Sequence, residues 1–193
     1  MNYLAHSFLS CGDEDLLLGN LVTDLIRKKD ETAYSQSIRK GIDLHRKIDT
    51  YTDQHPIVHD TLPLIYPTQG KYASVVLDIL WDYYLSINWK NFSGEELGEF
   101  TNNVYSILEK NYHQIQDKIV VRFESMIAHN FLLSCSTEAA LQSTFTHLQK
   151  RAKFKANFDK VGEILEAHHD ELNDAFMKML PEMISYVELN CQC

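Results

Sequence analysis

The sequence predicts a single all-α domain, because three of its properties favour helices over strands. Only 7 Gly and 4 Pro occur among its 193 residues, and long stretches contain neither. Several of these stretches repeat apolar residues at three- and four-residue steps, which is the period of an amphipathic helix. The composition, 45% hydrophobic and 23% charged, is that of a folded globular chain. We therefore expect one helical bundle over residues 1–193, long enough to bury a sizeable core.

Local signals set the boundaries of the expected helices. Gly12 ends the first helix, Asp13 is a plausible N-cap for the second, and Pro56 ends the third. Ser93–Glu96 has the pattern of a capping box. The segment 30–40 is polar and is expected to be a loop or a short turn. The expected helices cover residues 1–10, 14–28, 42–54, 57–65, 72–89, 93–111, 117–134, 137–150 and 158–178, with a last short helix beginning at Pro181.

Charge and cysteine usage exclude several classes of protein. The net charge of −9 makes nucleic acid and anionic membranes poor partners. No apolar run approaches the roughly 20 residues that span a bilayer, and no signal-peptide pattern opens the chain. The cysteines lack CxxC spacing, which argues against a zinc ribbon or a disulfide framework and for a reducing compartment. We therefore expect a cytoplasmic protein.

A polar stripe borders an apolar stripe on the expected helix 42–54. Carboxylates at the edge of a core are costly unless they are paired or bound to a metal. Imidazole and carboxylate one turn apart suit a divalent cation such as Mn²⁺, Fe²⁺ or Zn²⁺. The alternative is a solvated helix face that happens to be acidic. The stripe comprises His45, Asp49, Thr52 and Asp53.

Two other helices carry polar pairs among apolar neighbours. Asn20 and Asp24 are one turn apart on the helix 14–28. Asp78 and Asp82 have the same spacing in 72–89, the most apolar segment of the chain, which should be central to the domain. A buried carboxylate pair needs cations, histidines or a metal. Unless these side chains project into solvent between apolar neighbours, the pairs belong to a site.

Four short motifs occur in a fixed order: MNYLAH at the start, GNLVTD at 19–24, HRKIDTYTD at 45–53 and LDILWDYYL in the apolar helix. On these motifs, which all lie in residues 1–89, the chain resembles the acyl carrier protein phosphodiesterase family. That family resembles the all-helical HD-type metal phosphohydrolases. The resemblance implies hydrolysis of the phosphodiester that joins 4′-phosphopantetheine to the serine of holo-acyl carrier protein. It also implies a divalent cofactor, Mn²⁺ before Mg²⁺ or Fe²⁺.

The resemblance implies roles for particular residues. The expected metal ligands are Asp24, His45, Asp49 and Asp78. The other residues expected in catalysis are Arg46, to neutralise developing charge, Asp53 and Asp82, as proton acceptors along with Asp49, and His6. The residues expected to bind the substrate are Asn20, Arg27, Lys28 and Lys47.

The chain departs from the family pattern at three places. HRKID lacks an adjacent His-Asp pair, Phe131 stands where similar sequences tend to carry tryptophan, and the basic run 27–29 replaces an expected glycine. Two alternatives therefore stay open. One is an HD-like phosphohydrolase that acts on a small nucleotide or phosphoester, and the other is a helical binding protein without catalysis. Nothing in the sequence indicates the oligomeric state.

An acidic carrier protein would need local positive patches on this acidic chain. The first candidates lie close in sequence to the expected ligands, and a fourth patch is a weaker choice. The alternative is that all of these charges only keep the surface solvated. The patches are Arg27–Lys29, Arg39–Lys40 and Arg46–Lys47, followed by Lys150–Lys155.

Overall fold

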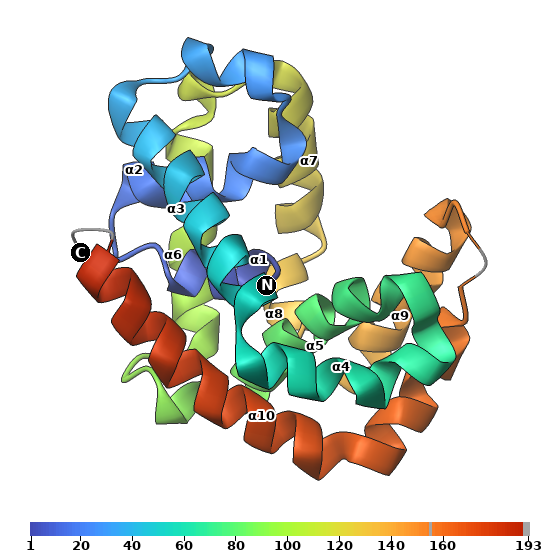
Figure 1. Ribbon diagram of the computed structural model, residues 1–193. Helices are drawn as coiled ribbons and strands as arrows, with labels where there is room; N and C mark the ends of the chain where they lie inside the picture. The colour runs from blue at the N-terminus through green and yellow to red at the C-terminus, as the bar shows by residue number, and fades with distance from the viewer. Residues whose placement is uncertain (155, 191–193) are drawn as a thin grey trace.

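The computed structural model describes residues 1–154 and 156–190, and every regular element within them is helical (Figure 1). Short 3₁₀ turns, η1 to η6, join several of the α-helices. The all-α prediction is therefore confirmed. The α-helices are α1 Tyr3–Phe8, α2 Glu14–Val22, α3 Gln36–Gln54, α4 Pro56–Gln69, α5 Ala73–Ile87, α6 Leu97–Lys110, α7 Asp117–Ala128, α8 Phe131–Ser134, α9 Glu138–Arg151 and α10 Val161–Asn190.

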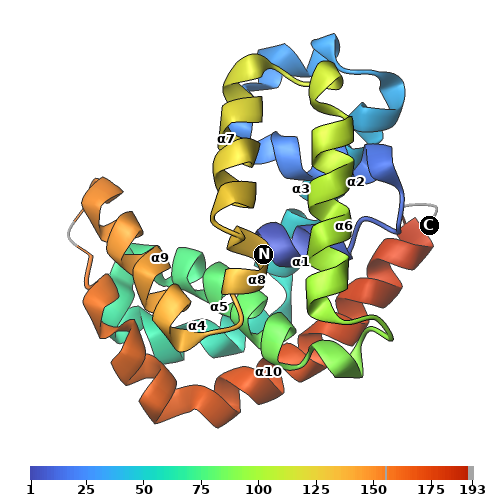
Figure 2. The same ribbon diagram turned by 180° about the vertical axis from the view of Figure 1, so that it is seen from behind.

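Helix α1 lies at the middle of the structure, where two groups of helices meet (Figures 1 and 2). The helices α2, α3, α6 and α7 lie to one side, and α4, α5 and α9 lie to the other. The long α10 runs beneath both groups and packs against α3, α4 and α5. This arrangement leaves α1 in contact with α2 and α5.

Helix α5 is the core helix that its apolar sequence predicts. Trp81 and Tyr84 on this helix are fully buried and pack against Phe176 of α10. Apolar side chains cover nearly every direction around the helix axis, so α5 has to be surrounded by other helices. Asp82 is buried among these side chains with no exposed surface.

The second and third helices differ from their predicted bounds. The helix predicted over 14–28 ends at Val22, and Thr23–Leu25 form the 3₁₀ turn η1. The hydroxyl of Thr23 donates to the carbonyl of Gly19, a local bond that competes with helix continuation. The polar segment 30–40 is largely helical, because η2 occupies Lys28–Ala33 and α3 begins at Gln36. Ser35 caps α3 by accepting from the amide of Ile38.

Three later boundaries were also predicted wrongly. The segment 117–134 divides into α7 and α8, because Asn130 takes a left-handed conformation with φ of 46°. The predicted helices 158–178 and Pro181 onward are one element, α10, which bends at His168 and contains Pro181 within it. Ser93 accepts from the amide of Glu95, and the helix begins only at Leu97, so no capping box forms.

The cysteines give a mixed result. Cys11 is disulfide-bonded and Cys135 is a half-buried free thiol, whereas Cys191 and Cys193 lie outside the described residues. One bonded cysteine is not a disulfide framework, and the reducing compartment stays a prediction. Among the described residues, no helix is long and apolar enough to cross a bilayer.

Candidate metal centre

Two glycines allow α2 and α3 to touch through their backbones. A Cβ atom added to Gly19 would lie 2.0 Å from the carbonyl oxygen of Ile38, and one added to Gly41 would lie 2.3 Å from that of Leu16. Both distances are far below any real contact, so side chains are excluded here. This close approach sets Asn20, the residue after Gly19, beside His45, which is one turn beyond Gly41.

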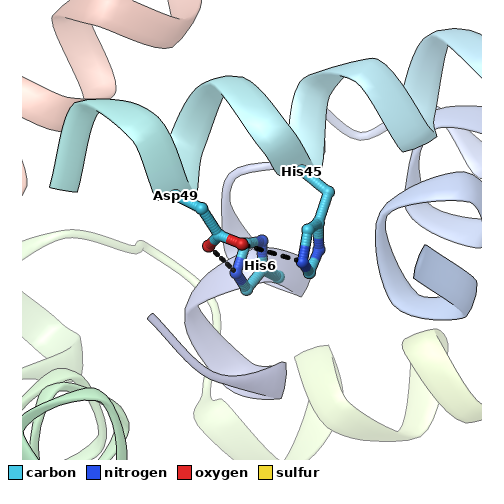
Figure 3. Close-up of side chains that lie close together, drawn as sticks. All are labelled: His6, His45 and Asp49. Atoms are coloured by element: carbon cyan, nitrogen blue, oxygen red, sulfur yellow. Dashed lines mark ion pairs between the residues drawn. The ribbon is translucent and has the colours of Figure 1, made fainter. Parts of the chain in front are cut away.

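Four side chains from three elements meet at this place and form what we call the His/Asp cluster: His6 of α1, Asp24 of η1, and His45 and Asp49 of α3. Figure 3 shows the Asp49 carboxylate facing both imidazole rings, with a dashed line to each. Asp49 Oδ1 lies 3.2 Å from Nε2 of His6, and its Oδ2 lies 3.1 Å from Nε2 of His45. Asp24 Oδ1 lies 3.3 Å from the same nitrogen of His45. The two rings stack with centroids 4.1 Å apart.

Asn20 fixes the tautomer of both histidines. Its side-chain oxygen lies 2.7 Å from Nδ1 of His6, and its main-chain oxygen lies 2.8 Å from Nδ1 of His45. Since both oxygens can only accept, each Nδ1 carries a proton and donates it. The Asn20 amide nitrogen in turn donates to the carbonyl of His6 and to the hydroxyl of Ser10. Both Nε2 atoms are thereby turned toward the carboxylates.

Burial and neighbouring charges shift the pKa values of these groups in opposite directions. Burial lowers the pKa of His6, so this imidazole is neutral at pH 7. Burial also acts against the charged form of His45, but hydrogen bonds and charges from Asp24 and Asp49 outweigh it and raise its pKa to about 9. The hydrogen bond from His45 holds the pKa of Asp24 below its usual range. Desolvation acts against the charged form of Asp49, but the hydrogen bond and the charge of His45 outweigh it and lower its pKa.

The donor set of the cluster suits a divalent cation. Nε2 of His6 is buried and makes no hydrogen bond, although the Asp49 carboxylate lies beside it. A neutral Nε2 with its lone pair toward a carboxylate oxygen is repulsive unless a cation lies between them. One ligand atom from each of His6, His45 and Asp49 lies within 4.8 Å of the other two, which suits a shared ion. Imidazoles oriented by a carbonyl at Nδ1 are typical of metal ligands.

The structure brings three of the four expected ligands together and leaves the fourth apart. Asp24, His45 and Asp49 belong to the His/Asp cluster. Asp78 instead accepts a 2.8 Å hydrogen bond from the amino group of Met1. Its pKa is raised, by burial first and also by the charges of Asp49 and Asp53, so it lies near the cluster without contacting a histidine. The fourth member of the cluster is His6 instead of Asp78, although His6 was expected only among the catalytic residues.

The two other expected acids differ in their surroundings. Asp53 lies one turn beyond Asp49 on α3 and is exposed. Asp82 has no exposed surface, and its two oxygens accept from the amides of Leu4 and Ala5. Burial raises the pKa of Asp82 to about 7 against these two hydrogen bonds.

The expected basic and substrate-binding residues lie outside the cluster or are already paired. Arg27 pairs with Asp30, and Arg46 donates to Glu31. Lys28 is exposed. Lys47, two residues from His45 and thus on the far side of α3, donates to the carbonyl of Asn190 in α10. Asn20 is wholly buried beneath the histidines rather than open to a substrate.

Sequence reasoning missed Tyr3. It lies one helical turn before His6, and its ring packs edge-on against Phe131 of α8. Burial raises the pKa of Tyr3 to about 12, with Asp24 raising it further and Arg122 and Arg151 lowering it. The helical spacing from His6 was a usable signal for Tyr3. The predicted patch Lys150–Lys155 includes Arg151 of α9, whereas no local pattern pointed to Arg122 of α7.

Comparison with known proteins identifies one family. The family model described as "Acyl carrier protein phosphodiesterase" matches residues 1–183. Proteins of that name are 28% identical in Photorhabdus laumondii, over 97% of this chain and 96% of the relative, and 28% identical in Enterobacter sp. strain 638, over 95% and 96%. A further one in Escherichia coli O6:K15:H31 is 29% identical over 95% and 96%. No solved structure matches the chain.

Proposed function

Because this chain belongs to the acyl carrier protein phosphodiesterase family, we propose that it hydrolyses the phosphodiester between 4′-phosphopantetheine and the serine of holo-acyl carrier protein. The products are apo-acyl carrier protein and free 4′-phosphopantetheine. The family match supports the substrate, and the His/Asp cluster supports the class of chemistry. The single observation that carries the metal-dependent part is the buried Nε2 of His6, which faces Asp49 without a hydrogen bond.

We propose His6, His45, Asp49 and Asp24 as the residues that hold a divalent metal, Mn²⁺ before Mg²⁺ or Fe²⁺. Such a cation, when bound, supplies Lewis acidity to the phosphoryl group and to an attacking water. Asp78 stays a candidate outer ligand, because its carboxylate lies near enough to Asp49 for the two charges to interact. The HD-type relationship of the fold stays a prediction.

The protein groups supply positioning and proton transfer. Asp24 is 61% exposed at its side chain, so it can meet both the cluster and an incoming substrate. Asp53 is also exposed, and it is a candidate to accept the proton that the attacking water loses. Asp82 does not suit this role, because both of its oxygens are engaged inside the core.

Positive charge for the phosphate can come from either of two sources. Arg46 must first leave Glu31 and Asp43, to which it is paired. Arg122 and Arg151 form no ion pair among the described residues, and their charges act on the Tyr3 hydroxyl together with that of Asp24. We therefore favour these two guanidinium groups as contacts for the phosphoryl oxygens.

The proposal is tested by offering the Mn²⁺-loaded protein three substrates: holo-acyl carrier protein, a small chromogenic phosphodiester and nucleotides. We expect turnover of the carrier. Asp24→Ala and His45→Ala should lower bound Mn²⁺ and turnover together, His45→Ala by at least about 100-fold in turnover, because each removes a ligand. Asp60→Ala, an exposed acid on α4, serves as the control and should change neither.

Different outcomes would point to different functions. Hydrolysis of nucleotides without hydrolysis of the carrier would support an HD-like phosphohydrolase for small substrates. Full metal content and full activity in both cluster variants would show that the cluster is not the reacting site.

A further inference from the structure

Asp82 is a buried carboxylate that the proposed chemistry does not use. It lies on α5 with no exposed surface, and it cannot touch a substrate. Its Oδ2 accepts from the amide of Leu4 at 2.8 Å and its Oδ1 accepts from the amide of Ala5 at 3.0 Å. A carboxyl group whose two oxygens both accept in this way has a defined structural partner, which is the first turn of α1.

The first turn of α1 needs such a partner. The first amides of any helix have no acceptor within the helix, and a side chain at the N-cap position usually supplies one. In α1 the N-cap residue is Asn2, and its side chain makes no capping bond. The carboxylate of Asp82, 77 and 78 residues away in sequence, replaces it.

Helix α1 depends on these outside contacts because it is short. It spans six residues, Tyr3–Phe8, and an isolated helix of that length is unstable in water. His6 follows Ala5 directly, so a shift of the first turn moves the imidazole with it. The other polar contact of the His6 side chain is with Asn20, which bonds to Nδ1 on the opposite edge of the ring from Nε2.

We infer that Asp82 is a positioning residue for the His/Asp cluster: it caps α1 and thereby holds Nε2 of His6 against Asp49. This inference rests on the proposed metal-binding role of the cluster. It assigns Asp82 no contact with the metal, the substrate or the reacting atoms. The one-turn spacing of Asp78 and Asp82 that suggested a ligand pair then has a different meaning, since both carboxylates hold the N-terminal segment of the chain.

The inference is tested with Asp82→Asn, which keeps the shape of the side chain and one acceptor oxygen. Its NH₂ group would face one of the two amides, so one capping bond is lost. We expect Mn²⁺ affinity, measured by calorimetric titration, to fall on the order of tenfold. Hydrogen exchange at the Leu4 and Ala5 amides of the metal-free protein should accelerate. Should this variant fail to fold by circular dichroism, Asp82→Ser, which keeps a hydroxyl acceptor without the opposing NH₂ group, takes its place.

A double-mutant cycle with His6→Ala separates positioning from general damage. If Asp82 acts through His6, the Asp82 substitution should weaken Mn²⁺ binding in the wild-type background and have no further effect once His6 is alanine. Asn88→Ala, at the C-cap of the same helix, is the matched control. It removes hydrogen bonds to Tyr84 and Asn173 and should lower the melting temperature without changing Mn²⁺ affinity.

Two results would overturn the inference. One is an unchanged Mn²⁺ affinity in Asp82→Asn, and the other is an equal loss with and without His6. Neither depends on turnover, so a failure of the proposed substrate, seen as no hydrolysis of the carrier by the wild-type protein, is distinguishable from a failure of the positioning role. A wild-type protein that binds no Mn²⁺ would overturn both the proposed metal centre and this inference.

Discussion

At the scale of single residues, Asn20 determines how the two histidines present themselves. It accepts from Nδ1 of His6 through its side chain and from Nδ1 of His45 through its main chain. Both Nε2 atoms then face the carboxylates, where a cation could bind, but they differ in basicity. His6 is buried and neutral, whereas Asp24 and Asp49 hold a proton on His45 with a pKa of about 9. A metal must therefore displace a proton from His45 and none from His6.

This difference predicts the pH dependence of metal binding. Since His45 is protonated below about pH 9, Mn²⁺ affinity of the metal-free protein should rise about tenfold per pH unit between pH 6.5 and 8.5. Titration calorimetry at several pH values measures it. The Asp24→Asn variant lacks one of the charges that raise the pKa of His45. The rise in its Mn²⁺ affinity should therefore level off at a lower pH. A flat affinity across this range would contradict the assignment of His45 as a ligand.

The proton on His45 weakens Mn²⁺ binding, but it stabilises the fold of the metal-free protein. The folded-state pKa of His45 lies above its ordinary value near 6.5. Its ion pairs therefore contribute stability that is fully present below about pH 6.5 and is lost as the pH rises through about 9. Mn²⁺ binding and proton binding thus stabilise the fold in adjacent pH ranges.

Much of the cluster was predictable from residue spacing, and the rest was not. Helical periodicity placed His45 and Asp49 on one face, and the structure has them 3.1 Å apart. It could not show that His6 lies across from them, because that contact joins segments 43 residues apart in sequence (49 − 6). The one-turn spacing of Asp78 and Asp82 was read correctly as a shared face. Their partners, the N-terminal amino group and two backbone amides, have no signature in side-chain patterns.

At the scale of elements, the contact between α2 and α3 builds half of the metal centre. Gly19 and Gly41 let the two backbones touch, and Asn20, Asp24 and His45 follow within one or two turns of these glycines. Helices that pack through ordinary side chains lie 8–10 Å apart. At such a separation, Asn20 would not reach Nδ1 of His45 with its main-chain oxygen.

Gly41→Ala is expected to separate these helices. Its methyl group would lie 2.3 Å from the backbone oxygen of Leu16, which has no room to yield, so we expect a loss of 1–3 kcal/mol in unfolding free energy, on the order seen for overpacked cores. Mn²⁺ affinity should fall as well. Gly98→Ala in α6 is the control, because nothing lies within 4 Å of its added methyl group. Denaturant unfolding and metal titration measure both effects, and a Gly41→Ala protein with wild-type values would refute the close-contact argument.

Helix boundaries were harder to predict than helices. The break after Val22 and the separation of α7 from α8 arise from single residues, a threonine hydroxyl and a left-handed asparagine, that apolar periodicity does not detect. Pro181 predicts a helix start, because proline is common at the first position of a helix. In α10 it lies inside a helix whose bend comes earlier, at His168, where the backbone leaves helical angles.

At the scale of the whole molecule, acids balance two cations of the first predicted patches, whereas Lys28, Lys29, Arg39 and Lys40 form no ion pair among the described residues. Arg27 pairs with Asp30, and Arg46 pairs with Glu31 and Asp43. The weaker predicted patch also holds unpaired cations, and exposed aromatic side chains adjoin it. We use "basic rim" for Lys71, Lys150 and Lys153, which form no ion pair within the described part of the chain. Phe154 and Tyr66 are 60% and 62% exposed, and together with Lys71 they line one surface pocket of about 570 Å³. Lys155 of that patch lies outside the described residues.

The unpaired cations and the exposed aromatic side chains of the basic rim predict that this patch attracts an acidic carrier protein. Reversing the basic rim to glutamate should raise the KM for the carrier about tenfold and flatten its dependence on salt. Reversing Arg27, Lys28 and Lys29 should do less, because the charge of Arg27 is already neutralised. Steady-state kinetics at several salt concentrations compare the two variants. A small diester, which does not dock, is the control substrate, and an equal or opposite ranking would show that the rim does not receive the carrier.

The packing of α10 against α3 also has a consequence for the entropy of folding. Lys47 and His55, on or beside α3, bond to Asn190 and Glu182 across 143 and 127 residues of chain. The contacts of Asn20 with the two histidines close loops of only 14 and 25 residues. Each doubling of loop length costs about 0.6 kcal/mol in closure entropy. The contacts of Asn20 in the metal centre therefore close short loops at a low cost in entropy. The contacts of α10 with Lys47 and His55 close much longer loops and cost more entropy.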